Sequence, residues 1–169
     1  LRSLRAAGQV SSSPCLKGVH SVENGRLAHV RELLRDQGHD RVLITSREHV
    51  FYLSGFSGSS GWLLIDQDRQ ILLSDFRYRD QANAQSSDWD FHMVQKGLPA
   101  AIREMTADWV GNSVALEGDH LTVRELDLLT GPPEGDMAEV PQSVRWTPTH
   151  DLLRGVTLIK DQGEIDTIA

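Results

Sequence analysis

Residues 52–65, YLSGFSGSSGWLLI, place three evenly spaced glycines between two apolar runs. The spacing of Gly55, Gly58 and Gly61 lacks the GxGxxG order of a dinucleotide-binding turn, and no Lys-Ser or Lys-Thr pair follows as in a P-loop. The serines between the glycines are not framed as the G-x-S-x-G of a nucleophile elbow. The stretch therefore predicts a tight connection between two strands, in which glycine allows positive φ or close backbone approach.

Several short apolar runs around this loop have the length and composition of strands. They are rich in Val, Ile, Leu and aromatic residues and are bounded by polar residues. Near-continuous apolar strands of this kind are typical of a sheet that is covered on both faces. The strands predicted in this way are 41–45, 49–53, 61–66 and 69–75 as a hairpin, 113–118, and an edge strand at 142–146.

Three segments with helical spacing alternate with these strands. The first covers 24–37, with Asn24 as its N-cap and Gly38 in the left-handed position that ends it. The second covers 98–109, and the third covers 121–131, opening with the capping box Thr122 to Glu125. Alternation of strands and helices predicts the α/β class.

Composition limits the classes of partner. The 169 residues suit one domain, and 17 Lys and Arg against 24 Asp and Glu give a net charge of -7, so we expect no nucleic-acid partner. A single cysteine, Cys15, excludes an internal disulfide framework and favours a cytoplasmic location. No stretch approaches the roughly 20 apolar residues that span a bilayer, so we expect no membrane partner. Residues 1–20 are interpreted as a flexible tail or a remnant of cloning.

The histidines and carboxylates give no metal motif. The seven histidines are scattered without an HExxH pair, so we expect solvent-facing side chains and no metal site. Carboxylates follow several predicted strands, where they could gather around Mg²⁺ or, as Asp does most often, cap turns. They are Asp66, Asp75, Asp80, Glu117 and Asp119.

Glu117 and the segment 74–82 are the two sharper candidates. Glu117 lies inside an apolar strand, where a charge needs a partner, and a buried pair with Arg77 or Arg79 is expected. The segment SDFRYRDQA at 74–82 places Asp75, Arg77, Tyr78 and Gln81 directly after a strand. It could position a ligand or a neighbouring subunit, or it could be the polar start of a helix.

Four motifs in this order resemble the N-terminal domain of the creatinase, prolidase and aminopeptidase P family. They are TSREHVFYLSGFSGSSGWLLI at 45–65, ILLSDFRYRDQA at 71–82, VALEGDHLT at 114–122 and LLRGVTLIKDQGEIDTIA at 152–169. His49 stands where the family pattern commonly has Asn. The resemblance implies an α/β, ribonuclease H-like three-layer domain, a mixed β-sheet flanked by helices. In the family this domain precedes a pita-bread metallopeptidase domain.

The resemblance also implies a division of labour between two domains. Residues 21–158 would form the N-terminal domain, and 159–169 would begin the linking helix to a C-terminal catalytic domain. That second domain would hold two divalent metal ions, Mn, Co or Zn, and would remove a residue ahead of proline or split Xaa-Pro dipeptides. This fragment would then carry no cofactor, no metal ligand and no catalytic residue.

The expected role of this chain is to shape access for short proline-containing peptides and to supply contacts for a homodimer. Phe56, Arg77 and Tyr78 are the candidates for facing substrate or an interface. Two alternatives stay open: the N-terminal domain of a creatinase-type amidinohydrolase, and a stand-alone binding module. An apolar helical stripe that starts at Glu164 stops at Ala169, so we expect the natural chain to continue.

Overall fold

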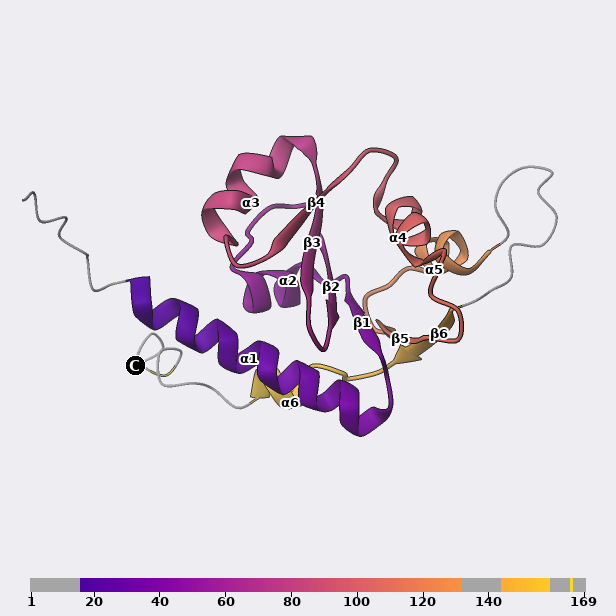
Figure 1. The fold of residues 1–169 in the computed structure, drawn as a ribbon, viewed down its shortest axis with the longest axis horizontal. Helices are drawn as coiled ribbons and strands as arrows, with labels where there is room; N and C mark the ends of the chain where they lie inside the picture. The colour runs from indigo at the N-terminus through magenta and orange to yellow at the C-terminus, as the bar shows by residue number, and fades with distance from the viewer. Residues whose placement is uncertain (1–15, 132–143, 159–164, 166–169) are drawn as a thin grey trace, which may run out of the picture.

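A six-stranded mixed sheet forms the centre of the molecule (Figure 1). The computed structural model describes residues 16–131, 144–158 and 165. The strand order is β4-β3-β2-β1-β5-β6, with β2 antiparallel to both of its neighbours and the other pairs parallel. The strands are β1 (Arg41–Ile44), β2 (Trp62–Asp66), β3 (Gln70–Asp75), β4 (Asp90–Val94), β5 (Ser113–Glu117) and β6 (Arg145–Thr149).

Helices cover both faces of the sheet and make three layers. Four helices pack on one face, and α4 with α5 packs on the other, as two separate apolar clusters. The helices are α1 (Leu16–Gln37), α2 (Arg47–Ser54), α3 (Arg79–Gln85) after the 3₁₀ turn η1 (Phe76–Tyr78), α4 (Leu98–Thr106), α5 (Val123–Thr130) and α6 (Arg154–Leu158). The predicted α/β class with a mixed sheet between helical layers is confirmed.

In the central strands, runs of successive residues are apolar because their side chains point to opposite faces of the sheet and pack into different clusters. In β1, Val42 and Ile44 join the cluster under α1 and α2, whereas Leu43 between them joins the cluster under α4 and α5. In β2, Leu63 and Leu64 divide in the same way. The central strands β1 and β2 therefore bury both of their faces, as the sequence pattern predicted, whereas the outer strands β4 and β6 are mostly half-buried or exposed.

Residues 49–53 form a helix, so the strand predicted there is wrong. Ser46 accepts a hydrogen bond from the backbone N–H of His49 at 3.2 Å and caps the start of α2. Val50 and Leu53, three residues apart, are buried on one side of the helix, whereas Phe51 is exposed. A short apolar run fits a strand or a buried helix equally well, and the cap decided between them.

The glycine loop consequently joins a helix to a strand and not two strands. Gly55 ends α2 at φ 71°, in the left-handed region. A Cβ on Gly58 would lie 2.2 Å from the ring of Phe56, and one on Gly61 would lie 2.8 Å from it. Both predicted reasons for glycine, positive φ and close approach, are confirmed within this loop.

The ends of other predicted elements also shift. Helix α1 begins at Leu16, inside the segment expected as a tail, so Asn24 lies within the helix and is not its cap; Gly38 ends it at φ 70° as predicted. The capping box of α5 is present. The edge strand β6 starts at Arg145, three residues later than predicted.

Strand β4 and helix α6 were not predicted, since each buries only one of its five residues and so lacks an apolar run. The open question at 74–82 is resolved in part, because the segment does lead into the 3₁₀ turn and α3. Residues 1–15, which include Cys15, and all of the predicted linking segment except residue 165 lie outside the described part of the chain.

Candidate functional site

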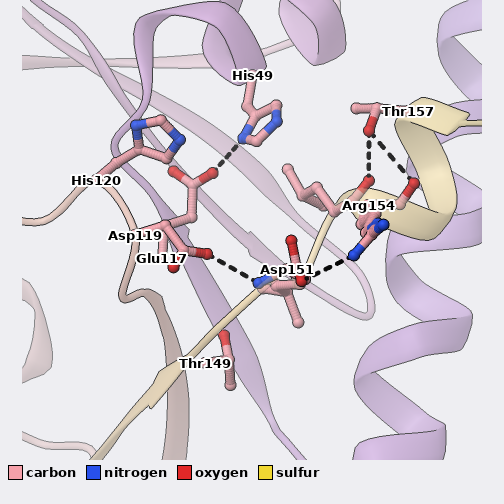
Figure 2. A pocket seen from close by; sticks show the side chains of 10 residues that line it. His49, Glu117, Asp119, His120, Thr149, Asp151, Arg154 and Thr157 are labelled. Carbon is pink, nitrogen blue, oxygen red and sulfur yellow. Dashed lines mark hydrogen bonds and ion pairs between the residues drawn. The ribbon is translucent and has the colours of Figure 1, made fainter.

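The three parallel strands β1, β5 and β6 end at the same edge of the sheet, and the loops after them surround a hollow of about 300 Å³ (Figure 2). Ligands of open α/β sheets generally bind at the carboxyl ends of the strands. Eight of its ten lining residues have polar side chains, and the lining comes from α2, β5, β6, α6 and the loops between them. Its members are His49, Glu117, Asp119, His120, Thr149, Asp151, Leu152, Leu153, Arg154 and Thr157.

Glu117 is the buried charge of this site, with only 4% of its surface exposed. Its carboxylate accepts hydrogen bonds from the backbone N–H of Thr45 at 2.6 Å and of Ser46 at 2.8 Å, and it pairs with Nδ1 of His49. Burial alone would raise the pKa of Glu117, but the hydrogen bonds from His49, Ser46 and Thr45 outweigh it and lower that pKa. The carboxylate is therefore held ionised inside the fold.

The expected arginine partner of Glu117 is wrong. Arg77 pairs instead with Asp75 at 2.8 Å, and Arg79 donates to the sulfur of Met93 at 3.3 Å. The helical conformation of 47–54 explains the difference, because it turns the His49 side chain toward the end of β5 (Figure 2). The prediction that Glu117 is buried and paired is confirmed.

Three of the seven histidines gather at this edge, although they are far apart in the sequence. The rings of His49 and His120 meet edge to face at a centroid distance of 5.7 Å. His49 is partly buried, which corrects the expectation of solvent-facing histidines at that position. Within the described residues, no group of three or more His, Cys, Asp or Glu side chains is arranged to hold a metal ion.

Asp119 ties the loop after β5 to the loop after β6. It accepts hydrogen bonds from Nδ1 of His150 at 2.8 Å and from the backbone N–H of Asp151 at 2.9 Å. The hydrogen bond from Asp151 lowers the pKa of Asp119 most, and the one from His150 lowers it further. The same contact raises the pKa of His150. Asp151 adopts φ 55° and pairs with Arg154 at 3.2 Å at the start of α6. The cluster can hold protons and polar groups, and it also fixes where α6 begins.

The three site residues predicted from the sequence lie elsewhere, on the other half of the sheet. Phe56 is fully buried and meets Tyr78 edge to face at 5.7 Å, so its ring is a core contact and does not face solvent. The hydroxyl of Tyr78 shares a hydrogen bond of 2.7 Å with Ser59. Arg77 keeps 63% of its side chain exposed. Of the three, Arg77 is the one that is open to a ligand or a partner.

Two of the carboxylates at strand ends cap turns, as that alternative predicted. Asp66 accepts from the backbone N–H groups of Asp68 at 2.9 Å and Arg69 at 2.6 Å. Asp75 accepts from the N–H of Arg77 at 3.0 Å and starts the 3₁₀ turn. The grouping of His49, His120 and His150 was not predicted from the sequence, although His120 and His150 lie just after β5 and β6, which are parallel.

Comparison with protein families gives one matching model. Residues 26–146 match the model of the creatinase/prolidase N-terminal domain. The chain is 36% identical over 85 residues to the uncharacterized peptidase YqhT of Bacillus subtilis and covers 23% of that protein. It is 29% identical over 142 residues, 80% of this chain, to a probable Xaa-Pro aminopeptidase P of Phaeosphaeria nodorum, of which it covers 19%.

Solved structures agree with the family match. The N-terminal domain of the cytoplasmic peptidase PepQ from Mycobacterium tuberculosis superposes with a TM-score of 0.66 at 27% identity, over 78% of this chain and 98% of that one. An Xaa-Pro dipeptidase from Bacillus anthracis gives a TM-score of 0.70 at 22% identity, over 85% of this chain and 38% of that one, and this likeness shows the fold. Among the described helices, none is both long and apolar enough to cross a membrane.

Proposed function

Because the chain belongs to the family of creatinase/prolidase N-terminal domains, we propose that it is the non-catalytic N-terminal part of an Xaa-Pro peptidase. One observation carries this proposal. The chain covers 98% of a solved N-terminal domain but only 23% and 19% of two relatives that are described as peptidases. Those relatives therefore have most of their length, and room for the catalytic centre, outside the part that this chain matches.

In the proposed enzyme, this domain narrows the approach to a catalytic domain that follows residues 159–169. Two divalent metal ions, Mn, Co or Zn, would supply the activated water and polarise the carbonyl ahead of proline there. A confined approach favours short peptides, because a folded protein cannot present its backbone in a narrow pocket. The exposed guanidinium of Arg77 can bind a peptide carboxylate, and Tyr78 lies next to it.

The same proposal includes a cytoplasmic location and a homodimer, with residues 21–158 as the domain and 159–169 as the start of the link. A creatinase-type amidinohydrolase and a stand-alone binding module are the competing functions. No contact among the described residues favours either of them over the peptidase. They differ from it in substrate, which makes a direct assay decisive.

The test uses the natural gene product that contains this domain. We expect Mn²⁺-dependent release of the first residue from a Xaa-Pro-Yaa peptide, or cleavage of an Xaa-Pro dipeptide, and loss of release after chelation with EDTA. Matched peptides with alanine in place of proline should not be cleaved. Hydrolysis of creatine instead would move the assignment to the amidinohydrolase, and a gene product of 18.8 kDa without any of these activities would overturn the enzyme proposal.

A further inference from the structure

The two outer strands of the sheet differ in how their free edges are protected. An edge strand presents unpaired backbone N–H and C=O groups that can pair with another chain, and a proline within the strand removes one of these donors. Strand β6 carries Pro148 as the fourth of its five residues, opposite Leu116 of β5. Strand β4, at the other end of the sheet, has no proline, and its strand pairing within the described residues is with β3 alone.

The surface beside the end of β4 is apolar and hollow. A hollow of about 510 Å³ lies at the carboxyl ends of β3 and β4, lined by Asp75, Phe76, Arg77, Met93, Val94 and Gln95. Phe76, the first residue of the 3₁₀ turn, is 73% exposed there. An aromatic side chain that is this exposed beside an open strand edge is typical of a contact surface.

Charges divide along β4 by sign. Asp88 and Asp90 lie at its start and are exposed. Lys96 follows its end and keeps 78% of its side chain exposed despite an ion pair of 3.8 Å with Glu104. An edge that is acidic at one end and basic at the other complements a second copy of itself in the antiparallel direction, and it repels a copy in the parallel direction.

We propose that β4 is the self-association edge of this protein, where two copies pair antiparallel about a two-fold axis at His92. This register places Asp88 of one copy opposite Lys96 of the other, and it joins the two sheets into one. The inference extends the homodimer of the proposed function by naming its surface, and it holds or fails without regard to peptidase activity. One short strand and one hollow bury less than a standard interface of roughly 1,600 Å², so the association is weak and depends on concentration.

A disulfide test reads the register directly. Residues directly opposite in an antiparallel pair have Cα atoms roughly 4.5 or 5.5 Å apart, and both separations fall in the range of a disulfide. In a Cys15→Ser background, His92→Cys should form a disulfide-linked dimer under mild oxidation. The matched control is Arg145→Cys in the same background, which puts an exposed cysteine on the edge that Pro148 protects. Equal crosslinking of both variants, or none for His92→Cys, overturns the proposal.

Charge reversal gives a second, independent reading by sedimentation of the 169-residue chain. Asp88→Lys or Lys96→Asp alone should weaken self-association about tenfold, and the double variant should restore it, because the pair across the axis is re-formed with reversed sign. High salt should reduce the difference between the variants. A chain that stays monomeric at every concentration, or a double variant that associates more weakly than both single variants, refutes the β4 dimer. If the dimer crosslinks but the peptidase assay fails, the β4 dimer is still supported and only the proposed enzyme function is refuted.

Discussion

A carboxylate inside a protein needs donors for its lone pairs, and Glu117 finds them in Thr45, Ser46 and His49, in the loop after β1 and in α2. Replacing Glu117 by Ala leaves the N–H groups of Thr45 and Ser46 without an acceptor. We expect Glu117→Ala to lower the free energy of unfolding by about 3 kcal/mol. Glu117→Gln keeps one acceptor oxygen and should lower the free energy of unfolding by less. Urea unfolding of the two variants measures the difference, and equal losses would show that the hydrogen bonds to the backbone do not matter.

The same residue predicts a pH dependence with a definite sign. The pKa of Glu117 is lowered below its ordinary 4.5 in the folded chain, so the ionised carboxylate stabilises the fold above pH 4.5. That contribution falls as the pH drops below 4.5, toward the lowered pKa. Unfolding measured between pH 7 and pH 3 should show a steeper loss for the wild type than for Glu117→Gln, whose side chain does not titrate. Parallel curves would contradict the prediction.

Gly58 is a glycine because of the ring that it touches. A Cβ there would lie 2.2 Å from Phe56, which is fully buried and cannot move aside freely. We expect Gly58→Ala to destabilise the chain by about 2 kcal/mol through overpacking. Gly25→Ala is the control, since it lies in α1 with nothing within 4 Å and should stabilise the helix slightly. Thermal unfolding of both variants tests the contrast, and a neutral Gly58→Ala would mean that the loop relaxes.

For single residues, the sequence predicts that a side chain must be paired or must be small better than it predicts which residue it contacts. A charge inside VALEG indicated that Glu117 must be paired, and three evenly spaced glycines indicated close approach. The identity of the partner could not be predicted, because His49 reaches Glu117 only when 47–54 is a helix. One misassigned element therefore changed the partner from an arginine to a histidine.

Among the helices, the N-terminus of α5 is the one whose capping contacts are most completely predicted by the local sequence. The N–H of Glu125 donates to the hydroxyl of Thr122 at 3.2 Å, and the N–H of Thr122 donates to the carboxylate of Glu125 at 2.9 Å. Thr122→Ala removes half of this box and should cost about 1 kcal/mol, whereas Thr122→Ser keeps the hydroxyl and should be nearly neutral. Chemical denaturation can resolve the two, and a loss shared by both would point to the methyl group of threonine instead.

Elements with a continuous apolar run or a long helical pattern could be predicted as elements, and those with few buried positions could not. The hairpin of β2 and β3 and the helices α4 and α5 carry their signals within their own residues. Strand β4 alternates exposed and buried positions over only five residues, and α6 has a single buried residue, Val156. Such elements are stabilised by what they pack against, which no local window contains.

For the whole molecule, the layered fold could be predicted from apolar strands that alternate with amphipathic helices. The candidate site could not be predicted from that pattern. The hollow at the carboxyl edge needs three loops that are brought together by the strand order β1-β5-β6. The contacts between these loops join His49 to Glu117, 68 residues apart, and Asp119 to His150, 31 residues apart. His49, His120 and His150 therefore looked scattered in the sequence. Strand order is the physical information that the linear pattern lacked.

Arg77 tests the role of the domain within the natural enzyme. Its side chain is 63% exposed, and its guanidinium is held toward Asp75 by two hydrogen bonds of 2.8 Å, so it is oriented without being buried. If it binds a peptide carboxylate or a second subunit, Arg77→Ala should raise KM for a short Xaa-Pro peptide about tenfold with kcat unchanged, or shift the monomer–dimer equilibrium by a similar factor, since a charge-assisted hydrogen bond contributes about 1.5 kcal/mol. Arg69→Ala, an exposed arginine in the β2–β3 turn, is the control and should change neither. Steady-state kinetics and sedimentation together decide: KM and association constants equal to those of the wild type would exclude Arg77 from both substrate and interface.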